Sequence, residues 1–140
     1  MKLKVLIADD SKVSQIMIDE ALSSELYSKR PAVNGQEALD LYYKWGPDVI
    51  LLDIMMPLVS GYTALKEIRL HEKNEKKPKK TVVIMLTALS DKESIVDCMK
   101  LGIQGYMVKP FHKEELCSRI DEGLKKTAGA AFPDPQIQAI

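Results

Sequence analysis

Short apolar runs alternate with segments of helical period along most of the chain. Their alternation predicts five strands, near residues 3–8, 27–33, 48–53, 81–87 and 105–109. The first, third and fourth of these are rich in valine, isoleucine and leucine, whereas the second is the least clear. Between these runs, apolar residues recur three or four positions apart, as they do in amphipathic helices. Strands that alternate with helices predict an α/β fold, in which a parallel sheet carries helices on both faces.

Helical spacing predicts a first helix over about residues 12–25 and a last helix over about 112–126. One apolar face of the first helix is made of Val13, Ile16 and Met17, with Ala21 as a further member. The second expected strand contains Pro31. Proline has no N–H to donate to a sheet ladder, so this strand suits the edge of the sheet.

Capping patterns mark the start of two further helices. Asn34 followed by Glu37 begins the second helix, and Ser90 followed by Glu93 begins the fourth. The glycine and proline at 46–47 end the second helix. Its core-facing residues are expected to be Ala38, Leu41, Tyr42 and Trp45.

The composition indicates one soluble domain with a sizeable core. Twenty basic residues balance twenty acidic ones among 140, so no overall basic field favours nucleic acid. No apolar stretch is long enough to span a membrane, and no signal-peptide pattern is present. We therefore expect a cytoplasmic protein that binds neither nucleic acid nor membrane directly. Cys98 and Cys117 are expected to be free thiols, and His71 and His112 to be solvated.

Two polar segments differ from the rest of the chain. Residues 71–80 carry five lysines and are expected to form a solvated loop, with a partner-docking patch as the alternative. Residues 127–140 are rich in small residues and contain two prolines. They are expected to be a tail or the start of a linker after a domain of residues 1–126.

Three acidic residues follow two of the expected strands. Asp9 and Asp10 come directly after the first strand, and Asp53 ends the third. In open α/β sheets, ligands bind at the carboxyl ends of the strands, so these side chains are expected to meet in one pocket. Like charges so close together repel one another, and a hard cation or a catalytic use would explain them.

Together with the residues that follow the fourth and fifth strands, these acids make the chain resemble the receiver domain of two-component response regulators, including the chemotaxis regulators. The resemblance covers roughly residues 2–126. The matching positions are Asp9, Asp10, Asp53, Met55, Met56, Pro57, Gly61, Thr87, Ala88, Tyr106, Lys109, Pro110 and Phe111. It implies a flavodoxin-like, doubly wound, five-stranded parallel sheet of order 2-1-3-4-5 with five helices.

The resemblance also implies a phosphorylation site. Asp53 would be the phosphoacceptor, because a carboxylate can form an aspartyl phosphate. Asp10 and Asp53 fit as direct ligands of Mg²⁺, with Asp9 holding a metal-bound water. The resemblance adds the backbone carbonyl of Met55 as a ligand. Lys109 would contact a phosphoryl oxygen, and Pro110 fits a cis bond after it.

The implied function is a signalling switch that catalyses its own phosphorylation. The donor would be a phosphohistidine on a sensor histidine kinase or a histidine phosphotransfer protein. Phosphorylation would draw in the hydroxyl of Thr87 and let Tyr106 rotate, to control an effector through the face of helix 4, strand 5 and helix 5. Met55 and Leu89 would flank the approach of water, and since both are bulky and apolar we expect slow dephosphorylation.

Other interpretations fit the residues less well. A magnesium-dependent phosphatase with an aspartate nucleophile would carry a second aspartate two residues later, where Met55 stands. A flavin-binding protein would carry a glycine- and hydroxyl-rich loop after the first strand instead of Asp9 and Asp10. Receivers that dimerise on transcription factors usually carry an acidic pair at the positions of Gln104 and Gly105, which forms salt bridges with basic residues of helix 5. Here Arg119 is present but the acidic pair is not, which argues against that dimer mode.

Overall fold

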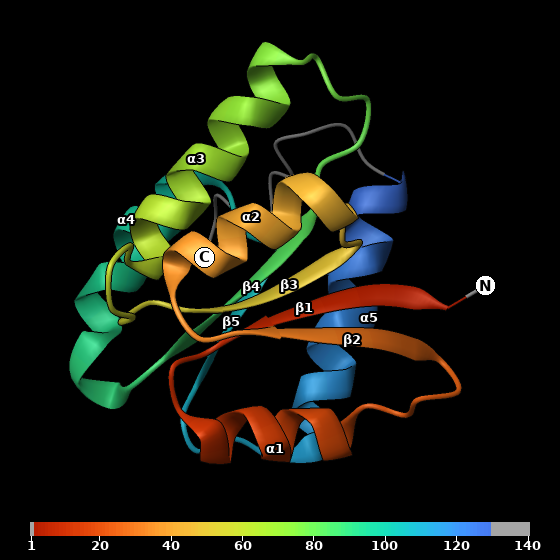
Figure 1. Ribbon diagram of the computed structural model, residues 1–140, viewed down its shortest axis with the longest axis vertical. Helices are drawn as coiled ribbons and strands as arrows, with labels where there is room; N and C mark the ends of the chain where they lie inside the picture. Colours follow the sequence, from red (N-terminus) through yellow and green to blue (C-terminus); the bar gives the residue numbers. More distant parts are fainter. Residues whose placement is uncertain (1, 130–140) are drawn as a thin grey trace.

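Five strands form one parallel sheet in the order β2-β1-β3-β4-β5 (Figure 1). The structure is a computed structural model that describes residues 2–129. Residues 130–140 of the tail expected at 127–140 lie outside the described residues. The expected boundary was wrong for residues 127–129, which belong to the last helix. The strands are β1 (Leu3–Ala8), β2 (Tyr27–Ala32), β3 (Val49–Asp53), β4 (Val82–Thr87) and β5 (Gly105–Val108). The sheet order expected from the sequence is confirmed, with Pro31 on the edge strand.

Helices cover both faces of the sheet. Figure 1 shows α1 and α5 on one face and α2, α3 and α4 on the other. The helices are α1 (Lys12–Ala21), α2 (Gly35–Trp45), α3 (Gly61–Asn74), α4 (Lys92–Leu101) and α5 (Lys113–Gly129), with a short 3₁₀ turn, η1 (Leu89–Asp91), before α4. The doubly wound α/β fold is therefore confirmed. No helix among residues 2–129 is long and apolar enough to cross a membrane.

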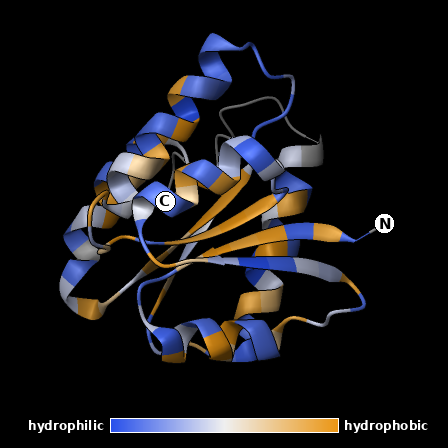
Figure 2. Ribbon diagram, in the orientation of Figure 1, coloured by the Kyte–Doolittle hydropathy of each residue, from blue (hydrophilic) through white to orange (hydrophobic). Residues whose placement is uncertain are grey.

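The two faces of the sheet build two apolar clusters. Because successive side chains of a strand point to opposite faces, Leu6 packs towards α2–α4 while Val5 and Ile7 pack towards α1 and α5. Strands buried on both faces are apolar along their whole length, which Figure 2 shows for the central strands. The cluster on the α2–α4 side includes Ala38 and Tyr42 of α2, as expected from their spacing.

The apolar stripe on α1 lies on its exposed side. Val13, Ile16 and Met17 are 67%, 58% and 56% exposed, whereas Ile18 and Leu22 are buried. The helix also ends at Ala21, four residues before its expected end. Leu22, which follows the helix, has extended backbone angles and is buried.

The predicted start of α2 is confirmed, and that of α4 is wrong. The side chain of Asn34 accepts the N–H of Glu37, and the Glu37 carboxylate accepts the N–H of Val33. Ser90 instead lies inside the 3₁₀ turn, which places the cap of α4 at Asp91, without a side-chain capping bond.

The end of α3 also differs from expectation. The helix continues to Asn74, so only the second part of residues 71–80 forms the expected loop. His71 is half-buried rather than solvated, because its Nδ1 lies 2.8 Å from the Tyr42 hydroxyl. His112 is exposed, and both cysteines are free thiols as predicted.

Candidate functional site

The carboxyl ends of β1 and β3 bring the three acids together. These strands pair in parallel, with Ala8 opposite Leu52, so Asp9 and Asp53 leave the sheet side by side. Side-chain oxygens of Asp9, Asp10 and Asp53 all lie within 4.8 Å of one another. Asp9 is fully buried and Asp53 is 7% exposed, whereas Asp10 is exposed. The cluster therefore opens to solvent on the side of Asp10.

Lys109, which follows the edge strand β5, contacts two of these carboxylates. It follows β5, and its Nζ lies 2.6 Å from Oδ2 of Asp9 and 3.0 Å from Oδ2 of Asp53. The Lys109–Pro110 peptide bond is cis, in keeping with the resemblance. The ammonium group of Lys109 therefore lies between two buried carboxylates and partly offsets their negative charge.

Burial controls the titration of the site. Burial raises the pKa of the Asp53 carboxyl to about 6; the hydrogen bond and charge of Lys109 oppose this rise, and the charge of Asp9 adds to it. Burial by itself would lower the pKa of Lys109, but the hydrogen bonds to Asp9 and Asp53 outweigh it, so that pKa is raised. At neutral pH, Asp53 is therefore ionised and Lys109 is charged.

Hydrogen bonds from Gln15, which were not predicted from the sequence, fix the end of β1. Nε2 of Gln15, on α1, lies 2.8 Å from the carbonyl oxygens of Ile7 and Ala32 and 3.0 Å from that of Asp9. The backbone N–H of Ser11 donates to Oδ1 of Asp9 at 2.9 Å. Backbone and side chain of Asp9 are therefore both fixed. The spacing of Gln15 gives no signal of this, since the contact depends on how α1 packs on the sheet.

The loop after β3 stays close to Asp53. The N–H of Met55 lies 3.3 Å from Oδ1 of Asp53, and the side chain of Met55 is 59% exposed. Gly61 begins α3 directly behind this loop. A Cβ on Gly61 would overlap the carbonyl of Asp53 and lie 2.8 Å from its carbonyl carbon, so glycine is required for this close approach.

The expected switch residues lie on β4 and β5. Thr87 ends β4, is fully buried, and donates its hydroxyl to the carbonyl of Ala88 at 2.9 Å. Tyr106 is half-buried in β5 and packs against the α2–α4 cluster. Leu89 is 67% exposed in the turn before α4. Its expected role and that of Met55 remain predictions.

The donor set suits a hard divalent cation. Mg²⁺ takes oxygen ligands at about 2.0–2.1 Å and is usually bound through one or two carboxylates together with waters and phosphate. Asp9, Asp10 and Asp53 supply oxygen only, and one side-chain oxygen from each lies within 4.8 Å of the others. The site could therefore hold a cation and a phosphoryl group together, with Lys109 facing the latter.

Comparison with known proteins places the chain in a family. The family model of the response regulator receiver domain matches residues 5–121. The chain is 41% identical over 131 residues to the protein named "Probable transcriptional regulator ycf27" of Guillardia theta, covering 94% of this chain and 49% of that protein. It is 32% identical to the chemotaxis protein CheY of Halobacterium salinarum, covering 89% of this chain and 98% of CheY.

A solved structure gives the same answer. The receiver domain of the sensor histidine kinase PA1611 from Pseudomonas aeruginosa, described with a magnesium ion in its active-site cleft, aligns with a TM-score of 0.76 and 27% identity. The alignment covers 89% of this chain and 99% of that one. The chain spans about half the length of the ycf27 protein. From the family match and the shared fold, the chain belongs to the response regulator receiver domain family.

Proposed function

We propose that this receiver takes a phosphoryl group onto Asp53 and thereby switches a downstream partner in the cytoplasm. The donor is a phosphohistidine on a sensor histidine kinase or a histidine phosphotransfer protein. A carboxylate oxygen of Asp53 attacks phosphorus, the phosphorus–nitrogen bond breaks, and the imidazole recovers its proton from solvent. The observation that carries this proposal is Lys109 Nζ held at 2.6 and 3.0 Å from Asp9 and Asp53.

The groups around Asp53 have different roles in the phosphoryl transfer. Asp10, Asp53 and the backbone carbonyl of Met55 would hold Mg²⁺, with Asp9 holding a metal-bound water. When bound, the ion offsets negative charge on the phosphoryl oxygens. Lys109 leaves its position between the carboxylates and contacts a phosphoryl oxygen. A turnover phosphatase is less well supported, because exposed Met55 supplies no acid or base two residues after Asp53.

The signal then passes from Thr87 to the effector face. Once phosphate is present, the hydroxyl of Thr87 exchanges its bond to the Ala88 carbonyl for one to a phosphoryl oxygen. The space that Thr87 leaves accepts the ring of Tyr106. This rearrangement changes the face made by α4, β5 and α5, where the effector binds.

Intact mass after treatment with acetyl phosphate and Mg²⁺ tests this proposal. Wild-type protein should gain one phosphoryl group, and Asp53→Asn should gain none. The matched control is Asp121→Asn, since Asp121 is an exposed aspartate on α5. A full phosphate adduct on Asp53→Asn would show that another residue is the acceptor.

A further inference from the structure

The loop after β3, residues 54–60, contains a strained turn. Its base is closed by the N–H of Gly61, which donates to the carbonyl of Ile54 at 2.8 Å. Within it, the N–H of Val59 donates to the carbonyl of Pro57 at 2.8 Å, around Leu58 with φ +67°. A turn of this kind with positive φ at a bulky residue is unfavourable. The Leu58 side chain is 83% exposed, so its packing does not hold the turn in place.

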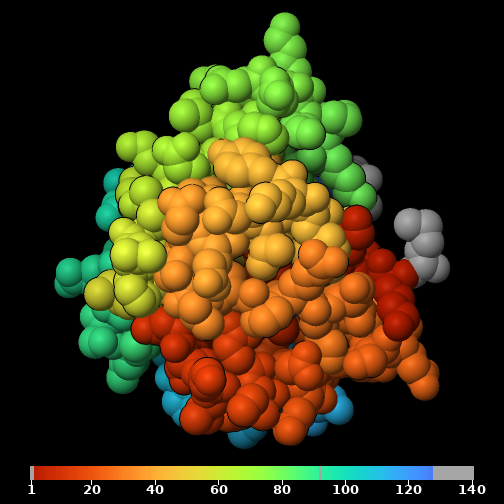
Figure 3. Space-filling model, in the orientation of Figure 1, coloured from red at the N-terminus to blue at the C-terminus, as the bar shows by residue number. Residues whose placement is uncertain are grey.

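The start of α2 lies directly against this loop. Gly35 is buried, and a Cβ there would overlap the carbonyl oxygen of Val59 and lie 2.6 Å from its carbonyl carbon and 2.7 Å from its Cβ. Such distances lie far inside van der Waals contact. In Figure 3, the start of α2 and the segment after β3 lie side by side on the molecular surface. Only glycine lets the helix approach the loop this closely.

Backbone conformation does not explain the glycine. The φ of Gly35 is not positive, so an alanine could adopt the same backbone angles. Alanine is also the better helix former, by about 1 kcal/mol in helix interiors. The requirement at position 35 is therefore one of space alone, set by the carbonyl of Val59.

Contacts at its other end connect the loop to the site. The N–H of Met55 lies 3.3 Å from Oδ1 of Asp53, and Gly61 approaches the Asp53 carbonyl from behind. The loop is thus held between α2 and the end of β3. A displacement of Val59 would be passed through this short loop to Met55 and Asp53.

We propose that Gly35 is a positioning residue for the phosphorylation site. By admitting α2 against Val59, it holds the strained loop so that the carbonyl of Met55 and the carboxylate of Asp53 keep the arrangement that binds Mg²⁺. The role of Mg²⁺ in this statement rests on the proposed function, whereas the hold on the loop does not.

Gly35→Ala tests the proposal through metal binding and loop dynamics. Calorimetry should show about tenfold weaker binding of Mg²⁺, the loss typical when groups supporting metal ligands are removed. Hydrogen exchange at the amides of Met55 and Val59 should become faster, although alanine favours the helix. Two controls should behave as wild type: Gln36→Ala, on the exposed side of α2, and Gly105→Ala, where the nearest atom lies 3.8 Å from the new Cβ.

Unchanged metal affinity and unchanged exchange in a folded Gly35→Ala protein would overturn the proposal. If that variant does not fold, Asn34→Ala decides instead, because loss of the cap loosens the first turn of α2 without adding an atom near Val59. About threefold weaker Mg²⁺ binding by Asn34→Ala is expected, and wild-type affinity would refute the role of α2. Wild-type protein that bound no Mg²⁺ would refute the proposed function alone, and the exchange data would still decide for or against Gly35.

Discussion

At the residue scale, Lys109 reduces the electrostatic repulsion among the clustered acids but does not cancel the effect of their burial. Its ammonium contacts Asp9 and Asp53 at once, yet the pKa of Asp53 is still raised to about 6, because burial outweighs that contact. Three carboxyl groups therefore face one ammonium group in a site that opens to water on the side of Asp10. The free protein therefore holds Asp53 in an unfavourable ionised state at neutral pH.

The stability of the metal-free protein should reflect this state. A carboxyl whose pKa rises on folding stabilises the fold below its unfolded value, near 4, and loses that contribution as pH rises through its folded value. In EDTA, the unfolding free energy of wild type minus that of Asp53→Asn should therefore fall between about pH 4 and 6 and then level off. A fall of about 1 kcal/mol is expected, below the roughly 3 kcal/mol that two pKa units represent, because water on the open side of the site at Asp10 weakens the effect of burial. Denaturant unfolding measures it, and a rising difference would mean that Lys109 dominates the pKa.

The lifetime of the phosphoryl group should depend on Met55 and Leu89. Both are exposed and apolar, and neither can hydrogen-bond a water that attacks phosphorus opposite Asp53. A polar side chain there could orient such a water and assist its attack, a contribution of about tenfold or more. The variant Met55→Asn with Leu89→Glu should therefore release phosphate faster than wild type. Equal release rates would show that these side chains do not control access.

The role of a single residue could be predicted only where its side-chain type was unusual for its place in the sequence. The acids and Lys109 could be identified because charged groups at strand ends are unusual and because they resemble a known family. Gln15 and Gly35 could not, because their roles depend on carbonyl groups of distant segments. Such contacts depend on tertiary packing, which leaves no local pattern in the sequence.

At the element scale, a buried ionic network joins α3 to the starts of two strands. Arg69 of α3 donates to Glu72 at 2.8 Å, to the carbonyl of Thr81 at 2.9 Å, to Oε1 of Gln104 at 3.1 Å and to the carbonyl of Gly102 at 2.8 Å. Oε2 of Glu72 accepts the N–H of Thr81. The network therefore fixes the chain where it enters β4 and where α4 ends.

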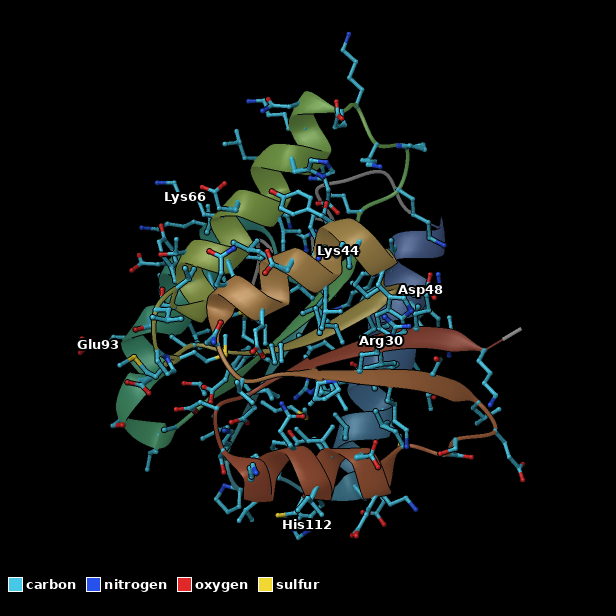
Figure 4. The ribbon with its side chains drawn as sticks, in the orientation of Figure 1. Arg30, Lys44, Asp48, Lys66, Glu93 and His112 are labelled. Carbon is cyan, nitrogen blue, oxygen red and sulfur yellow. The ribbon has the colours of Figure 1, made fainter. Side chains whose placement is uncertain are left out.

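Removing the arginine should unfold the protein more easily. Arg69→Met leaves the carboxylate of Glu72, which is 4% exposed, without its partner, and should lower the unfolding free energy by about 3 kcal/mol. Lys66→Met is the matched control, since Lys66 projects from the outer side of the same helix (Figure 4), and it should change stability by less than about 0.5 kcal/mol. Adding Glu72→Leu to Arg69→Met should recover part of the loss, and no recovery would mean that the network is not held by this ion pair.

Elements were predicted well in type and less well in orientation and ends. All five strands lie within one residue of their predicted bounds. The buried strands β3 and β4 are marked by their apolar residues, whereas β2, which carries Lys29 and Arg30, is not. In α1, however, an apolar stripe is present on the side opposite the buried Ile18 and Leu22. Helical spacing predicts that a helix forms, but when two apolar faces compete it does not say which one packs on the sheet. The start of α4 was misplaced because a 3₁₀ turn precedes it.

At the scale of the whole molecule, metal binding should stabilise the fold. Mg²⁺ that binds only the folded state adds about 1.4 kcal/mol at a concentration ten times its dissociation constant. That corresponds to a rise in melting temperature of roughly 3–6 °C for a domain of this size. Thermal melts with Mg²⁺ and with EDTA measure the rise, which Asp53→Asn should reduce. Equal melting temperatures for the wild type would argue against metal binding at the three acids.

The whole architecture was predictable because it follows from the alternation of strands and helices together with the resemblance. The order of strands came from the resemblance, and Pro31 agreed with it independently by favouring an edge.

The site also joins residues that lie far apart in the sequence. Lys109 contacts Asp9 across 100 residues of sequence and Asp53 across 56. During synthesis on the ribosome, both aspartates emerge long before the lysine that faces them. A nascent or prematurely terminated chain therefore carries Asp9 and Asp53 without the ammonium group that faces them. The site is complete only when translation has passed β5.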